Sequence, residues 1–68
     1  MKLYDWDVEC VINEKGKEPR TETVRVQAIN DERVARAGAV AKLENVWPPT
    51  IRAIARRARQ VGFVKEFV

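Results

Sequence analysis

The stretch Tyr4-Asp5-Trp6-Asp7-Val8-Glu9-Cys10-Val11-Ile12-Asn13 decides the fold, because its apolar and polar residues alternate with a period of two. Successive side chains of a β-strand point to opposite faces, so this alternation predicts a strand that is buried on one side only. Val11 is the one exception. The apolar face carries Tyr4, Trp6, Val8, Cys10 and Ile12, and the polar face carries Asp5, Asp7, Glu9 and Asn13.

A second alternating run covers residues 20–29, and a polar loop that contains Gly16 and Pro19 separates it from the first. Two alternating runs joined by a short polar loop predict an antiparallel hairpin. The register that we prefer sets Cys10 opposite Val24 and Glu9 opposite Arg25. A shift of two residues keeps the same faces aligned, so the pattern leaves that alternative open.

A helix is predicted after the hairpin, capped by Asn30 or Asp31 and ending near residues 45–46. Its end is set by Trp47-Pro48-Pro49, since a residue before proline is pushed out of the helical region. The stripe expected to face the sheet is made of small residues, which permit a close approach: Val34, Ala37, Gly38 and Ala41.

Residues 51–61 predict a second helix, with Thr50 as its cap and Gly62 just beyond its end. At 100° per residue, five apolar side chains gather in one stripe: Ile51, Ile54, Ala55, Ala58 and Val61. Residues 63–68 are then a short terminal strand. The expected fold is one α+β domain spanning residues 1–68, a small antiparallel sheet in ββααβ order with two helices on one face. Its expected core is Trp6, Val8, Val24, Val26, Ile51 and Ile54.

The composition argues against catalysis, metals and cofactors. The chain has no histidine, the usual general base, and its one cysteine, Cys10, falls on the apolar face of the first strand. Carboxylates two residues apart on a strand lie about 6.6 Å apart, too far to converge on one ion without further ligands. We therefore expect no enzyme, no metal site and no cofactor. No signal peptide and no apolar run of about 20 residues is present, which predicts a cytoplasmic protein.

The charge of the chain is uneven. The net charge is +3, yet residues 51–68 alone hold five basic residues and one acidic residue. Such asymmetry favours a polyanionic or acidic partner, although a solvated basic face is an equally ordinary interpretation. The candidate contact residues are Arg52, Arg56, Arg57, Arg59 and Lys65. The row Asp5, Asp7 and Glu9 is a second candidate surface, or a solvated face that Arg25 partly neutralises.

Two aromatic features have alternative interpretations. Tyr4, Trp6, Phe63 and Phe67 could form a base-stacking platform, but a domain this small is expected to bury such rings in its core. Trp47-Pro48-Pro49 could be a polyproline-type ligand, but a linker with Trp47 packed against the fold is the preferred interpretation.

The leading hypothesis is a small non-enzymatic binding protein whose basic second helix contacts nucleic acid or another polyanion through its exposed arginines. The alternative is a protein–protein interaction module. Residues 20–42, a strand that runs through Ala28-Ile29-Asn30-Asp31-Glu32 into a small-residue helix, resemble a layout seen in many small α+β proteins, including those of phages and mobile elements. That generic resemblance implies an accessory protein or a modulator of a host complex. We also expect open sheet edges and a small core to favour a homodimer.

Overall fold

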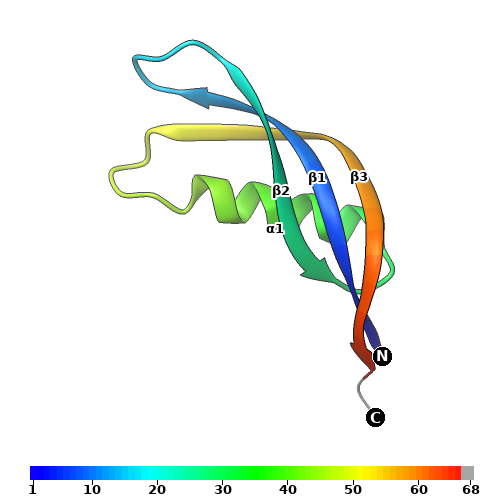
Figure 1. The fold of residues 1–68 in the computed structure, drawn as a ribbon. Coiled ribbons are helices and arrows are strands. Elements are labelled where there is room, and N and C mark those ends of the chain that lie inside the picture. The colour runs from blue at the N-terminus through cyan, green and yellow to red at the C-terminus, as the bar shows by residue number, and fades with distance from the viewer. Residues whose placement is uncertain (67–68) are drawn as a thin grey trace.

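The computed structural model describes residues 1–66, which form one sheet and one helix. Strand β1 (Lys2–Glu14) lies in the centre of a three-stranded antiparallel sheet with the order β2-β1-β3. Strand β2 (Arg20–Ala28) and strand β3 (Ile51–Glu66) flank it, and helix α1 (Glu32–Glu44) lies against the concave side of the bent sheet (Figure 1). The molecule is elongated, extending 45 Å along its longest axis.

The predicted hairpin is confirmed, but its register is shifted by two residues. Val8 lies opposite Val24, and Asp7 lies opposite Arg25. Our preferred register, with Glu9 opposite Arg25, was therefore wrong. Both registers bury the same face, so the alternation could not separate them. The observed register gains a forked ion pair between Arg25 and Asp7, and Gly16 turns the chain with φ of 81°, a conformation that favours glycine.

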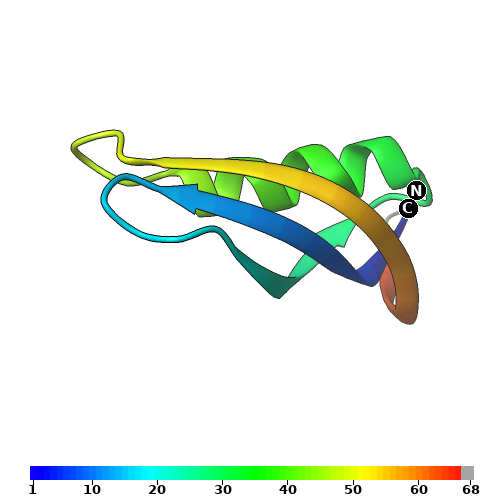
Figure 2. The same cartoon turned by 90° about the horizontal axis from the view of Figure 1, so that it is seen from above.

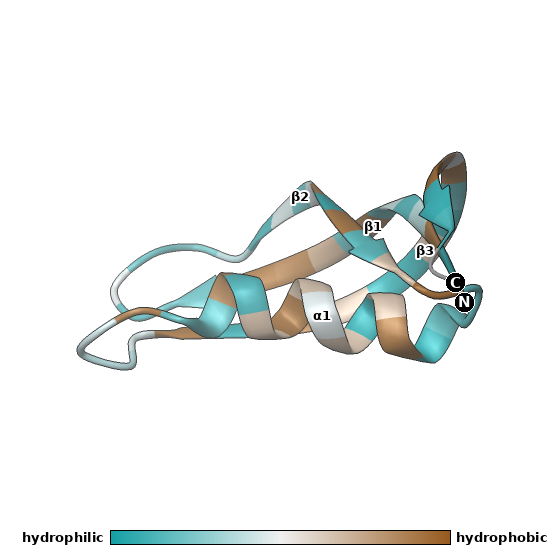
Figure 3. Ribbon diagram, turned by 90° about the horizontal axis from the view of Figure 1, so that it is seen from below, coloured by the Kyte–Doolittle hydropathy of each residue, from teal (hydrophilic) through white to brown (hydrophobic). Residues whose placement is uncertain are grey.

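Helix α1 begins and ends as expected, but it packs through a different stripe. The Asp31 carboxylate caps it by accepting a hydrogen bond from the Arg33 backbone N–H at 2.9 Å. Ala35 and Ala39 are fully buried against the sheet, whereas the predicted stripe Val34, Ala37, Gly38 and Ala41 is exposed. Small residues occur on both stripes, and Figure 3 shows apolar and polar segments alternating along the whole helix, so composition alone did not identify the buried side.

The predicted second helix is wrong, and the order is ββαβ with one helix. Residues 51–66 form a single strand that pairs antiparallel with β1 and curves strongly along its length (Figure 2). A β-bulge explains the misleading pattern. Ala55 lies opposite Cys10 and Arg57 opposite Glu9, so Arg56 is an extra residue. A bulge inserts one residue and bends the strand, so the inward residues Ala55 and Ala58 are three apart, as on a helix.

The core lies between α1 and the sheet. Its buried cluster is Trp6, Val8, Cys10, Val24, Ala28, Ala35 and Ala39, and Ile12 is fully buried nearer the loops. The prediction is confirmed for Trp6, Val8 and Val24, and Val26 packs against the cluster. It is wrong for Ile54, which is 61% exposed on the other face of the sheet, while Ile51 is half-buried. The terminal part of the predicted last strand, including Phe67, lies outside the described residues.

The sheet leaves β2 and β3 as edges. The end of α1 covers part of the β3 edge, because the Glu44 side chain accepts a hydrogen bond from the Ala53 backbone N–H at 2.8 Å. Antiparallel pairing of two copies of β3 about Ala58 would set Arg57 opposite Arg59, and like charges directly opposite are destabilising. The homodimer stays a prediction, and it now concerns the β2 edge.

Candidate nucleic-acid interface

The face of the sheet that points away from α1 is covered by no other described segment (Figure 1). Because side chains alternate between the two faces of each strand, charged side chains from all three strands gather on this face of the sheet. We call these residues, together with the bulge residue Arg56, the charged face. Strand β1 contributes a central acidic row, and arginines flank that row on both sides. The members are Asp5, Asp7, Glu9, Arg25, Arg52, Arg56, Arg57 and Arg59.

The predicted basic surface and the predicted acidic surface are therefore one surface. Arg59 lies opposite Asp7 and Arg57 lies opposite Glu9, so the acidic row runs beside the basic strand. The expectation that arginines project from a helix is wrong, because β3 is a strand. All four β3 arginines are nevertheless exposed, and the structure brings them together along one edge of the sheet.

Asp7 is the most strongly held carboxylate of the charged face. Its two oxygens accept hydrogen bonds from the Arg25 guanidinium at 2.6 Å and 3.3 Å. These hydrogen bonds, with the nearby positive charges of Arg25 and Arg59, lower the pKa of Asp7 below its ordinary value of 3.8. Asp7 therefore stays ionised at neutral pH and neutralises part of the positive charge around it.

A polar hollow lies beside this ion pair, between the acidic row and the two outer strands. Its lining residues are Asp7, Glu9, Thr23, Arg57 and Arg59. Each of the two carboxylates here has an arginine opposite it on β3, so the signs of charge are mixed. A phosphate that approaches the hollow would meet both signs, which makes this half of the face the weaker anion site.

The charged face becomes more positive toward the end of the sheet where β3 begins, beside the β1–β2 turn. Arg52 lies opposite Asn13 and Ile54 lies opposite Val11. The nearest carboxylate of β1 at this end is Glu14, opposite Ile51, and it is already paired with Lys17 and Arg20. Among residues 1–66, none of the four β3 arginines forms an ion pair with a carboxylate within 4.0 Å. Arg52 and Arg56 are therefore the members of the charged face most available to an external anion.

Lys65 does not belong to this site. It lies opposite Leu3 near the far end of β3, six residues beyond Arg59 and thus about 20 Å along the strand. Its neighbour Glu66 forms an ion pair with Lys2 at 3.8 Å. The grouping of Lys65 with the arginines was made from net charge alone, and the strand separates them.

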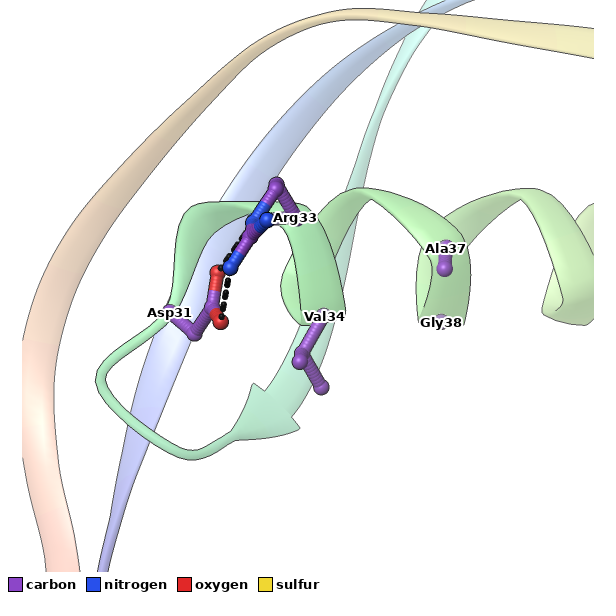
Figure 4. A pocket seen from close by; sticks show the side chains of 5 residues that line it. All are labelled: Asp31, Arg33, Val34, Ala37 and Gly38. Carbon is purple, nitrogen blue, oxygen red and sulfur yellow. Dashed lines mark hydrogen bonds and ion pairs between the residues drawn. The ribbon is translucent and has the colours of Figure 1, made fainter.

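Other features of the described residues are weaker candidates for a functional site. A shallow hollow near the start of α1 is lined by Asp31, Arg33, Val34, Ala37 and Gly38 (Figure 4). Its only carboxylate, that of Asp31, already caps the helix and pairs with the Arg33 side chain at 3.3 Å. Burial raises the pKa of the Cys10 thiol, which keeps it protonated. No group of three side chains within residues 1–66 is arranged to hold a metal ion.

The aromatic residues divide in an unexpected way. Trp6 is buried, as the core interpretation predicted, but that interpretation is wrong for Phe63, which is 57% exposed. The Tyr4 ring packs edge-on against the Phe63 ring at 5.7 Å between centroids. Trp47, in contrast, is 91% exposed in the loop between α1 and β3, so the prediction that it packs against the fold was wrong. A tryptophan followed by two prolines in a linker was the available signal.

Comparison with known proteins adds no relationship: no family model, curated protein or solved structure matches the chain. Among residues 1–66, no helix is long and apolar enough to cross a membrane. The geometry of the charged face therefore carries the functional argument.

Neutralising Asp7 offers a test of the electrostatics of this face. The change Asp7→Asn should raise affinity for a polyanion, because it removes a negative charge and releases Arg25 from its forked ion pair. The measurement is the dissociation constant for a short labelled oligonucleotide at low salt. Asp31→Asn, which removes one negative charge at the start of α1, is the matched control. Equal effects of both variants would show that only net charge matters.

Proposed function

We propose that this protein binds nucleic acid without catalysing a reaction, through contacts between phosphates and the arginines of the charged face. The observation that carries the proposal is the line of exposed guanidinium groups on β3. Arginine presents a planar fork of donors that matches phosphate oxygens, and its weak hydration suits such contacts. The chain has no histidine, and its one thiol is buried. Both observations support a binding function rather than a catalytic one.

The row of arginines on β3 is long enough to contact several successive phosphates of a nucleic acid. Arg52 to Arg59 spans seven residues, or about 23 Å at the usual rise of a strand. Because β3 is an extended strand, these side chains follow one another along the sheet instead of gathering around one point. A linear polyanion can contact all of them in turn, whereas a single small anion can contact only one or two.

The charge on the rest of the molecule supports the choice of face. On α1, the Arg36 side chain is paired with Glu32 at 2.6 Å, and Arg33 is paired with Asp31. Near the hairpin, Arg20 is paired with Glu14 and Glu22. Ion pairs within 4.0 Å thus partner these other arginines, whereas those of β3 have none among the described residues.

Salt dependence of binding is the direct test. Each phosphate contact releases condensed counterions, so the logarithm of the binding constant falls with the logarithm of salt by about 0.7 per contact on a single strand. Four contacts predict a loss of about 50-fold between about 50 and 200 mM salt. Fluorescence anisotropy of a labelled oligonucleotide measures this loss. Absence of binding at the lower salt concentration would contradict the proposal.

An acidic protein surface is the competing partner. An acidic host protein would pair with the same arginines, and the protein would then act as a modulator of that partner. In that case excess oligonucleotide would not displace the protein from its partner, and the salt-dependent binding of isolated nucleic acid would be absent.

A further inference from the structure

We infer that the nucleic acid is single-stranded and that Trp47 stacks on one of its unpaired bases; this inference rests on the proposed function. Trp47 is 91% exposed, whereas the other tryptophan, Trp6, is 6% exposed in the core. No contact within the described chain accounts for a large apolar ring held in water. An external flat, apolar surface would remove that ring from water, and an unpaired base presents such a surface.

The loop that carries Trp47 is joined to the β1–β2 turn and leads into the basic strand β3. The backbone N–H of Lys15 donates to the carbonyl of Thr50 at 2.9 Å, which joins this loop to the β1–β2 turn. Both loops lie at the same end of the molecule (Figures 1 and 2). Thr50 leads directly into β3, so Trp47 precedes Arg52 by five residues. Trp47 therefore belongs to the loop at the end of the sheet where β3 begins, beyond the acidic row Asp5, Asp7 and Glu9.

The start of β3, next to the Trp47 loop, also exposes both apolar and basic side chains. Ile54 is 61% exposed between Arg52 and Arg56, and its cross-strand neighbour is Val11. The order from the loop inward is an aromatic ring, an arginine, an apolar side chain and a further arginine. Interleaved aromatic and basic side chains are typical of proteins that track a single strand, where bases stack and phosphates lie against positive charge.

A duplex does not use this arrangement. Its bases are stacked on one another inside the helix, so Trp47 and Ile54 would face only the sugar-phosphate backbone. Binding to a duplex would then depend on the arginines alone. A single strand of equal phosphate content should therefore bind more tightly, and the difference should disappear when Trp47 loses its ring.

The test compares Trp47→Leu with the parent protein on a thymidine oligonucleotide and on a duplex of equal phosphate content. Loss of one base–aromatic stack should weaken single-strand binding by about 5- to 150-fold. The salt slope should not change, because no charge is removed. Trp47→Phe should recover part of the loss. Phe63→Leu is the matched control, since Phe63 is 57% exposed on β3 at the end of the sheet away from the Trp47 loop.

A spectroscopic measurement tests the contact itself. In a Trp6→Phe variant, Trp47 is the only indole, and its emission should be quenched by the single strand and little changed by the duplex. The anisotropy comparison does not need this variant, so it stands even where replacing buried Trp6 impairs folding. Equal affinity of Trp47→Leu and the parent protein, with salt-dependent binding intact, would overturn this inference alone. Absence of any salt-dependent oligonucleotide binding by the parent protein would overturn the proposed function and this inference together.

Discussion

Replacing Ile12 with alanine is expected to lower the free energy of unfolding by about 2–5 kcal/mol. Ile12 is fully buried and is the largest side chain of that kind in the described residues. Alanine would leave a cavity that the surrounding strands can only partly fill. A domain of 68 residues has a total stability of about 3–10 kcal/mol at the usual value per residue, so the loss is a large part of the whole. Urea denaturation followed by circular dichroism measures it.

Ile54→Ala is the matched control for that experiment. Ile54 is 61% exposed on β3, so the change should cost at most about 1 kcal/mol, mostly through lower strand propensity. If residues 51–61 formed the predicted amphipathic helix, Ile54 would be buried and its loss would resemble that of Ile12. Similar destabilisation by the two variants would therefore contradict the strand assignment of β3.

The sequence was informative where one pattern had one explanation. The period of two in β1 identified the strand, its buried face and the core positions Trp6 and Val8. Asp31 was correctly expected as a candidate cap, because its side chain precedes a run with good helix propensity. Both predictions depend on local chemistry that the rest of the chain does not change.

The sequence was misleading where pairing with a distant strand determines the secondary structure. Residues 51–61 are rich in alanine and arginine, which favour helices, and a bulge at Arg56 gives the inward residues a helical spacing. Pairing with the open edge of β1 overrides both signals. The hairpin register and the buried stripe of α1 failed for a related reason: each had two solutions that satisfied the same pattern.

The sequence identified the residues of the candidate site but not how they are arranged relative to one another. The arginines were singled out correctly as exposed, yet their neighbours Asp7 and Glu9 became visible only through the pairing of β1 with β3. Trp47 was expected to pack against the fold as part of a linker between two helices, although a tryptophan followed by two prolines in a linker was a signal for an exposed ring.

The double variant Arg52→Gln/Arg56→Gln is expected to weaken oligonucleotide binding by about 25-fold at about 100 mM salt. Each phosphate contact contributes about 0.7 to the salt slope, which corresponds to about 5-fold in affinity at this concentration. Arg52 lies opposite Asn13, and Arg56 is the extra residue of the bulge, so Glu9 keeps Arg57 as its cross-strand partner in the variant. Both side chains are exposed, and surface substitutions of this kind change stability little, so the variant should stay folded.

Arg33→Gln/Arg36→Gln on α1 removes the same net charge from the opposite side of the molecule and is the matched control. The deciding measurement is the salt slope of single-strand binding for the parent protein and both variants. The Arg52→Gln/Arg56→Gln slope should be smaller than the parent slope by about 1.4, and the α1 variant should keep the parent slope. Equal slopes for the two variants, or an unchanged slope for Arg52→Gln/Arg56→Gln, would contradict the assignment of nucleic-acid binding to the charged face.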